Sequence, residues 1–171
     1  YVYNTNADCN VSNYEQVKST NNPVLRICAR NRGSASSRSD SEMQGLPSVL
    51  YLSRGSRVML LTNLCCEDGL SNGCTGIVKD FMFDDIEKQN KDSYLPSVVW
   101  IQIDDNIYTG PTYFPDNNDR RNWVPIGVQT SYVTNAKDKA TSSRTMFPLR
   151  LCWAFTPWKI QGQTISDTLV A

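Results

Sequence analysis

The sequence predicts a mostly β protein that also contains α/β elements. Short runs of β-branched, aromatic and other apolar residues recur along the chain, separated by glycine, asparagine, aspartate and proline. Helix-start signals are nearly absent. Near the C-terminus, Leu149 to Phe155 alternates with period two and has little polarity on either face, which is typical of a strand covered on both sides.

The composition allows one ordinary domain with a packed interior. The chain has 171 residues, of which 40% are hydrophobic. Lysine plus arginine and aspartate plus glutamate are balanced at 17 each, so any contact with nucleic acid must be local. No stretch approaches the roughly 20 apolar residues of a membrane span, and no secretory signal opens the chain. We therefore expect a soluble, intracellular protein with no membrane partner.

The first 44 residues predict a short helix, a strand and a loop. Ser12 and Glu15 have the spacing of a helix capping box. Pro23 to Arg30 alternates apolar and polar residues, which predicts a strand with one wet face in the same sheet as the C-terminal strand. Asn31 to Gln44 is serine-rich and has few apolar residues, so we expect a mobile loop and a subdomain boundary there.

From Gly45 onward the sequence predicts short strands that close into a small barrel. Two apolar runs on either side of DGLSNG predict a hairpin, because Asn72-Gly73 is a strong turn signal. Further strands are predicted at Ser97 to Asp104 and at Trp123 to Val133. The hairpin turn is expected to use positive φ at three glycines, Gly69, Gly73 and Gly76. Tyr113 and Trp123 are able to stack on bases, although barrel aromatics more often belong to the core.

A polar loop follows the C-terminal strand. Five hydrogen-bonding side chains surround Gly162, whose missing side chain would let backbone N–H groups approach a phosphate closely. These are Thr156, Lys159, Gln161, Gln163 and Thr164. Phosphate or a nucleic-acid backbone is the natural ligand of such a loop. From these residues alone, an ordinary polar loop without a ligand is an equal alternative.

The sequence lacks the groups of a complete nucleotide-hydrolysing site. No glycine is followed by lysine, so there is no phosphate loop, and there is no adjacent Asp-Glu pair to hold magnesium. Six cysteines are scattered without paired spacing and histidine is absent, so no metal site is expected and most thiols are interpreted as small buried hydrophobes. We expect no catalytic residue in this chain.

The C-terminal loop resembles a motif of known helicases. In motif V of the Pif family of superfamily 1B DNA helicases, and of Helitron-type transposon helicases, a strand ending in Trp-Ala leads into Thr-Ile-His-Lys-Ser-Gln-Gly-x-Thr. The chain matches at Trp153, Ala154, Thr156, Lys159, Gln161, Gly162 and Thr164, and has Pro157, Trp158 and Ile160 at the Ile, His and Ser positions. Ordered blocks between Gly45 and Leu149 are also similar, among them Leu52, Gly55, Arg57 to Leu60, Gly69, Asn72, Gly73, Tyr108, Gly110, Pro125 and Arg144.

The resemblance implies a domain organisation. Residues 1–44 would be part of a RecA-like domain, 2A, and residues 45–147 an inserted Src-homology-like small β-barrel, 2B. Residues 148–171 would return to 2A with the motif V strand and loop. Other helicase motifs lie outside the matched region in the family, so we expect the chain to be a fragment cut at both ends.

The resemblance also implies a function, that of a fragment of an ATP-dependent 5′–3′ DNA helicase in repair, recombination, telomere maintenance or transposition. DNA contacts would come from Thr156, Lys159 and Gln161, and from Thr5 and Asn6 near the N-terminus; Gly162, Gln163 and Thr164 would face the nucleotide. ATP and Mg²⁺ belong to the complete enzyme, with ATP shared with an N-terminal RecA-like domain that is absent here, so the chain alone is expected to bind neither and to be inactive. The family further implies a monomer that binds single-stranded DNA in the nucleus.

Two alternatives stay open at this point. Thr5 and Asn6 also fit an N-terminal turn and helix cap with no ligand. The whole chain also fits a non-enzymatic module that binds single-stranded nucleic acid or a protein, left from a degenerate transposon.

Overall fold

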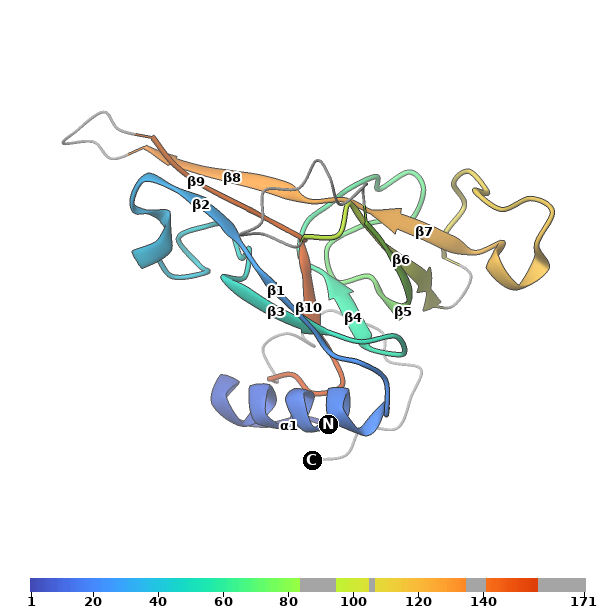
Figure 1. Ribbon diagram of the computed structural model, residues 1–171, viewed down its shortest axis with the longest axis horizontal. Helices are drawn as coiled ribbons and strands as arrows, with labels where there is room; N and C mark the ends of the chain where they lie inside the picture. The colour runs from blue at the N-terminus through green and yellow to red at the C-terminus, as the bar shows by residue number, and fades with distance from the viewer. Residues whose placement is uncertain (84–94, 105–106, 135–140, 157–171) are drawn as a thin grey trace.

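The computed structural model describes residues 1–83, 95–104, 107–134 and 141–156. Within these residues the chain forms one α-helix and ten strands, and the strands make three antiparallel sheets (Figure 1). The mostly β class predicted from the sequence is therefore confirmed. No helix in the described part of the chain has the length and apolar character needed to cross a membrane.

The largest sheet has five strands and contains most of the core. Its order is β10 (Leu149–Leu151), β4 (Arg57–Leu60), β5 (Thr75–Met82), β6 (Val98–Ile103) and β7 (Trp123–Ile126). Alternate residues of each strand point inward, so the period-two pattern of the sequence becomes one apolar face. The inward side chains include Val58, Leu60, Val78, Val99, Ile101, Val124, Ile126 and Leu149, all buried.

Strand pairing among the described residues differs from the closed barrel that the sequence predicts. β10 and β7 are the two edges of the five-stranded sheet, and no described pair joins them. Strand pairs also cross both predicted domain boundaries, because β10 pairs with β4 and β2 (Arg30–Arg32) pairs with β9 (Thr141–Met146).

The predicted hairpin is present as β4 and β5, with Gly76 opposite Val58. Gly69 and Gly73 have φ of 83° and 92° in the intervening turn, as expected. The prediction for Gly76 is wrong, because this glycine lies inside β5 and is not among the residues with positive φ. A Cβ there would come 2.5 Å from the carbonyl oxygen of Gln102 on β6. Gly76 is thus required by the close approach of a neighbouring strand, not by a turn.

Two smaller sheets correct two further predictions. β1 (Leu25–Cys28) pairs with β3 (Val49–Leu52), and not with the C-terminal strand as expected. The predicted strand at Trp123 to Val133 is split between two sheets: β7 belongs to the five-stranded sheet, and β8 (Gln129–Thr134) pairs with β9 in the sheet β2-β9-β8. Gly127 separates β7 from β8.

The serine-rich segment, predicted to be a mobile loop, is folded instead. It contains β2 and the 3₁₀ helix η1 (Gly33–Ser37), and it buries Ala35 and Met43. The fully buried guanidinium of Arg144 donates four hydrogen bonds within it, to Asn31 Oδ1, Asp40 Oδ1 and the carbonyl oxygens of Ala35 and Arg38, and a fifth to the Leu46 carbonyl just beyond it. A side chain about 100 residues away in sequence therefore supplies the order that the segment's own composition lacks.

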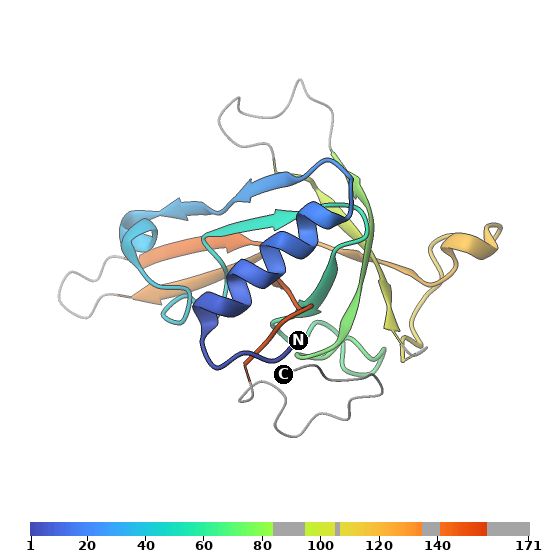
Figure 2. The same cartoon turned by 90° about the horizontal axis from the view of Figure 1, so that it is seen from below.

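Helix α1 (Asn6–Ser19) begins earlier than predicted. Thr5 is its N-cap, because the Thr5 hydroxyl accepts a hydrogen bond from the Asp8 amide, and Ser12 lies inside the helix. In the view from below, α1 lies across the β1-β3 sheet (Figure 2). Tyr14 packs edge-on against Tyr51 of β3 with ring centroids 5.4 Å apart, which holds the helix to that sheet.

Candidate nucleic-acid interface

The C-terminal strand has two halves with different partners. β10 pairs antiparallel with β4, and beyond it Phe155 forms a parallel bridge with Val2. Two backbone bonds make this bridge, from the Phe155 amide to the Tyr1 carbonyl and from the Tyr3 amide to the Phe155 carbonyl, both 3.1 Å. The inward side chains of this stretch are Cys152, Ala154 and Thr156, whereas Trp153 and Phe155 are half-buried.

Parallel pairing brings three of the predicted contact residues to one edge of the fold. Because the segments at Val2 and Phe155 run in the same direction, the residues that follow them leave at the same end. Thr156 follows one segment directly, and Thr5 and Asn6 follow the other at the start of α1. A helix N-terminus at the carboxyl end of parallel strands is a common anion-binding arrangement.

Each of the three residues has a distinct environment. The Thr5 hydroxyl donates to Asp8 Oδ2 at 2.6 Å, so an acidic side chain of the first turn already lies at the helix N-terminus. Asn6 is exposed to solvent. Thr156 is buried, with 6% of its surface exposed. The remaining predicted residues, Lys159, Gln161, Gly162, Gln163 and Thr164, lie outside the described residues.

Asn13, which was not predicted from the sequence, joins α1 to the C-terminal strand. Its side chain donates from Nδ2 to the Ala154 carbonyl at 2.9 Å and accepts from the Ala154 amide at 2.8 Å. Asn13 is 3% exposed and lies between buried Cys9 and Val17 on one side of the helix. The four-residue spacing of Cys9, Asn13 and Val17 could have indicated this contact from the sequence. A polar residue within an apolar stripe of a helix must find a buried partner.

The Tyr1 backbone nitrogen lies at the same junction, 2.8 Å from the Trp153 carbonyl oxygen. Residues 1–3, α1 and residues 153–155 are therefore tied by backbone and amide hydrogen bonds, which make a rigid base for the chain that leaves at Thr156.

A second polar cluster lies on the outer side of the five-stranded sheet. Arg57 Nη2 donates to Asp104 Oδ2 at 2.8 Å, and the Thr75 hydroxyl donates to the same oxygen at 2.6 Å. Burial and the Asp104 charge raise the pKa of the Cys74 thiol, and burial raises the pKa of Cys152 to about 12. The Arg57 charge is thus compensated within the protein, which favours a structural role for this side chain.

The aromatic residues singled out from the sequence form one cluster at the edge strand β7. Trp100 lies 5.9 Å from Tyr113 and 4.9 Å from Phe114, and Phe114 lies 6.0 Å from Trp123. The guanidinium of Arg120 lies over the Trp123 ring at 5.0 Å. These rings pack on one another and are partly covered by a cation. Tyr113 is 47% exposed, and none of the four rings is among the described residues that pack against the hydrophobic core.

Thiols and carboxylates do not gather into a metal site in the described part of the chain. All six cysteines are described and free. Cys9 and Cys152 are buried, Cys65 and Cys74 half-buried, and Cys28 and Cys66 exposed, so the interpretation as buried hydrophobes holds only for part of the set.

No protein-family model and no curated protein matches this chain. Solved structures do match. The Pif1 helicase from Candida albicans matches with a TM-score of 0.67 and 25% identity, over 97% of this chain and 37% of that chain. Unliganded Pif1 from a Bacteroides species matches with a TM-score of 0.61 and 22% identity, over 96% of this chain and 43% of that chain.

A third structure, of Bacteroides Pif1 in complex with ADP-AlF3 and single-stranded DNA, matches with a TM-score of 0.60 and 22% identity. It covers 96% of this chain and 32% of that chain. The chain therefore spans less than half the length of the helicases that it matches, over almost all of its own length.

Proposed function

We propose, given that this chain is a segment of a Pif1-like helicase, that it forms the DNA-facing part of an ATP-dependent 5′–3′ DNA helicase. In this proposal the edge at which α1 begins and residues 153–156 end holds single-stranded DNA. Lys159 neutralises a phosphate there. Thr156 and Gln161 hydrogen-bond beside it, Thr5 and Asn6 contact the strand, and Gly162, Gln163 and Thr164 face the nucleotide.

One observation carries the proposal. The parallel bridge of Val2 with Phe155 and the paired bonds of Asn13 with Ala154 hold the segment that leads to Thr5 and Asn6 against the segment that leads to Thr156, although the two lie about 150 residues apart in sequence. A rigid base of this kind is what positioning a nucleic-acid backbone requires.

The subdomain assignment belongs to the same proposal. We assign residues 45–147 to the 2B insertion and the flanking segments, 1–44 and 148–171, to domain 2A. The five-stranded sheet supports this assignment, because four of its strands, β4 to β7, come from 45–147. Pairing of β2 with β9 and of β10 with β4 would then couple 2A to 2B through backbone hydrogen bonds.

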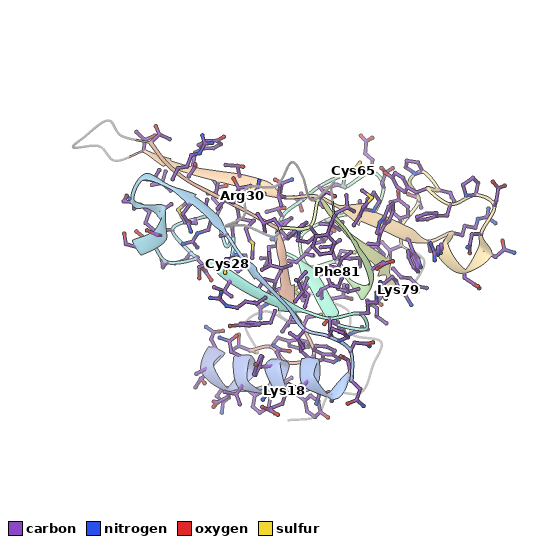
Figure 3. All side chains as sticks on the ribbon, viewed as in Figure 1. Lys18, Cys28, Arg30, Cys65, Lys79 and Phe81 are labelled. Atoms are coloured by element: carbon purple, nitrogen blue, oxygen red, sulfur yellow. The ribbon has the colours of Figure 1, made fainter. Side chains whose placement is uncertain are left out.

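The DNA contact is tested by binding of a fluorescent oligo-dT to the purified chain. We expect weak binding that falls with salt. Lys159→Ala should reduce affinity several-fold at low salt and lower the slope of log affinity against log salt by about 0.7, the value for one phosphate of a single strand. Lys18→Ala is the matched control, since Lys18 lies on the outer side of α1 and pairs with Glu15 (Figure 3). An unchanged affinity for the Lys159 variant would remove this residue from the proposed site.

ATP binding and hydrolysis would close the two RecA-like domains in the complete helicase and so drive each step along DNA. The donor set of this chain does not fit a complete nucleotide site, because it has no phosphate loop and no group of metal-ligating side chains among the described residues. We therefore assign no hydrolytic step to it, and predict that the purified chain shows no magnesium-dependent ATP turnover. Measurable turnover by pure protein would contradict this prediction.

The same absence of a phosphate loop favours a second candidate, a non-enzymatic module that binds single-stranded nucleic acid or a protein. ATPase assays on the product of the whole coding sequence separate the two. For the helicase, replacing a phosphate-loop lysine supplied by the rest of the protein abolishes DNA-stimulated turnover. Turnover that is unchanged when such a lysine is replaced would count against the helicase, and a product without DNA-stimulated turnover would support the non-enzymatic module.

A further inference from the structure

The outer face of the sheet β2-β9-β8 has an unusual set of side chains. Strand register aligns six outward positions in two rows across the sheet. One row is Arg30, Thr145 and Thr130, and the other is Arg32, Ser143 and Tyr132. The hydroxyls of Thr130 and Thr145 lie 2.7 Å apart, so these side chains share one side of the sheet.

The two faces of this sheet have different surroundings. The inner face carries Ser131, Ser142 and Arg144, which are 1%, 3% and 0% exposed. Helix η1 covers it, with the Ser34 amide donating to Ser142 Oγ at 3.1 Å. On the outer face both arginines and Thr130 are exposed and Tyr132 is 64% exposed, whereas Thr145 is half-buried and Ser143 is buried at 9%. Contacts on the inner face therefore stabilise this sheet.

The chemistry of the outer face is uniform. All six side chains can donate hydrogen bonds, none is aliphatic, and the three strands contain no aspartate or glutamate, although the chain has 17 acidic residues. A surface without aliphatic groups has little to gain from docking a hydrophobic protein face. A second copy of the same face would bring the arginine pairs together and repel.

A single-stranded nucleic acid has groups that these side chains can bind. Arg30 and Arg32 lie two residues apart, about 6.7 Å along the strand, a separation that successive phosphates of an extended single strand can match. The exposed ring of Tyr132, in the same row as Arg32, offers a stacking surface for a base. In the other row, the exposed hydroxyl of Thr130 and the half-buried hydroxyl of Thr145 can donate to phosphate or base acceptors.

We infer that the outer face of β2-β9-β8 is a second contact surface for single-stranded DNA. This inference rests on the proposed function and adds a contact that the α1 edge does not provide. The three-stranded sheet and α1 lie on opposite sides of the molecule (Figures 1 and 2), and Arg30 lies on the sheet side (Figure 3). The two contacts therefore engage different stretches of DNA.

The test is oligo-dT binding by the purified chain as a function of salt. Tyr132→Ala should weaken binding by about 5- to 100-fold, the range for loss of one stacked base, and Tyr132→Phe should retain the affinity. The double variant Arg30→Ala, Arg32→Ala should lower the salt slope by about 1.4. All these residues are exposed, and circular dichroism verifies that the variants stay folded.

Arg54→Ala is the matched charge control, because Arg54 is exposed and pairs with Asp80 outside this sheet. It should leave both affinity and salt slope unchanged. Wild-type affinity in the Tyr132 and arginine variants together with a loss in Lys159→Ala would overturn the inference and leave the proposed function standing. Losses in the sheet variants with no effect of Lys159→Ala would instead support the sheet face and count against the proposed site. Equal losses in Arg54→Ala would show a nonspecific charge effect and also overturn the inference.

Discussion

At the scale of single residues, Asn13 links the helix to the strand that leads to the proposed DNA contact. A buried amide that both donates to and accepts from one backbone residue satisfies two groups that water cannot reach. Ala154 is itself fully buried, so its amide and carbonyl depend on this side chain.

We predict that Asn13→Ala lowers the free energy of unfolding by about 2–4 kcal/mol, because it leaves two buried backbone groups unpaired. Urea denaturation measures the loss, and hydrogen exchange at the Ala154 amide should become faster. Asn10→Ala, on the exposed side of the same helix, is the control and should change stability by less than about 0.5 kcal/mol. Equal effects of the two substitutions would show that the Ala154 bonds contribute nothing measurable.

At the scale of elements, Gly76 decides how closely β5 and β6 approach. An added Cβ would meet the Gln102 carbonyl oxygen at 2.5 Å and Ile101 Cγ2 at 2.7 Å, and a strand backbone cannot move as a flexible side chain does. We predict that Gly76→Ala destabilises the protein by about 3 kcal/mol in urea denaturation. At Gly127 a Cβ would meet nothing within 4 Å, so Gly127→Ala should leave stability unchanged or raise it by up to about 1 kcal/mol. A Gly76→Ala variant of wild-type stability would mean that the two strands separate at little cost.

Local patterns in the sequence predicted the hairpin and its neighbour well. The β4-β5 hairpin and β6 were foreseen because alternating apolar residues and an Asn-Gly turn act over a few residues. The ordered structure of the serine-rich segment was not predicted, because it depends on Arg144, which is remote in sequence. Partners of β1 and β8 were missed for the same reason, because alternation assigns a face to a strand but not a neighbour.

The candidate site shows the same limit. The predicted helix start at the Ser12 capping box is wrong, and the alternative cap at Thr5 is where the helix begins. That Thr5 and Asn6 lie at the same edge as Thr156 depends on the parallel bridge at Val2, for which no local pattern exists. Asn13 was missed because it contacts the strand and not a ligand.

At the scale of the whole molecule, burial of ionisable groups makes the fold sensitive to alkaline pH. Burial raises the pKa of Cys152 from an ordinary value of 9.0 to about 12, and burial likewise raises that of Tyr108 to about 12. Below pH 9 the Cys152 thiol is protonated in both folded and unfolded chains. Between pH 9 and 12 only the unfolded chain loses this proton, so the unfolded state is favoured as pH rises.

We therefore predict that the free energy of unfolding falls above pH 9 by up to about 1.4 kcal/mol per pH unit for Cys152 alone. Urea denaturation at pH 8.5, 9.5 and 10.5 under reducing conditions measures the slope. Cys152→Ala should lower the free energy of unfolding at pH 8.5, because it leaves a cavity. It should also make the fall of that free energy with pH less steep, because one proton fewer is released on unfolding. Cys28→Ala, at an exposed thiol, is the control and should keep the wild-type slope. If the free energies of unfolding of Cys152→Ala and wild type fall in parallel from pH 8.5 to 10.5, the Cys152 thiol does not resist ionisation in the folded protein. Residues 152–156 then pack less tightly against the sheets than the structure indicates.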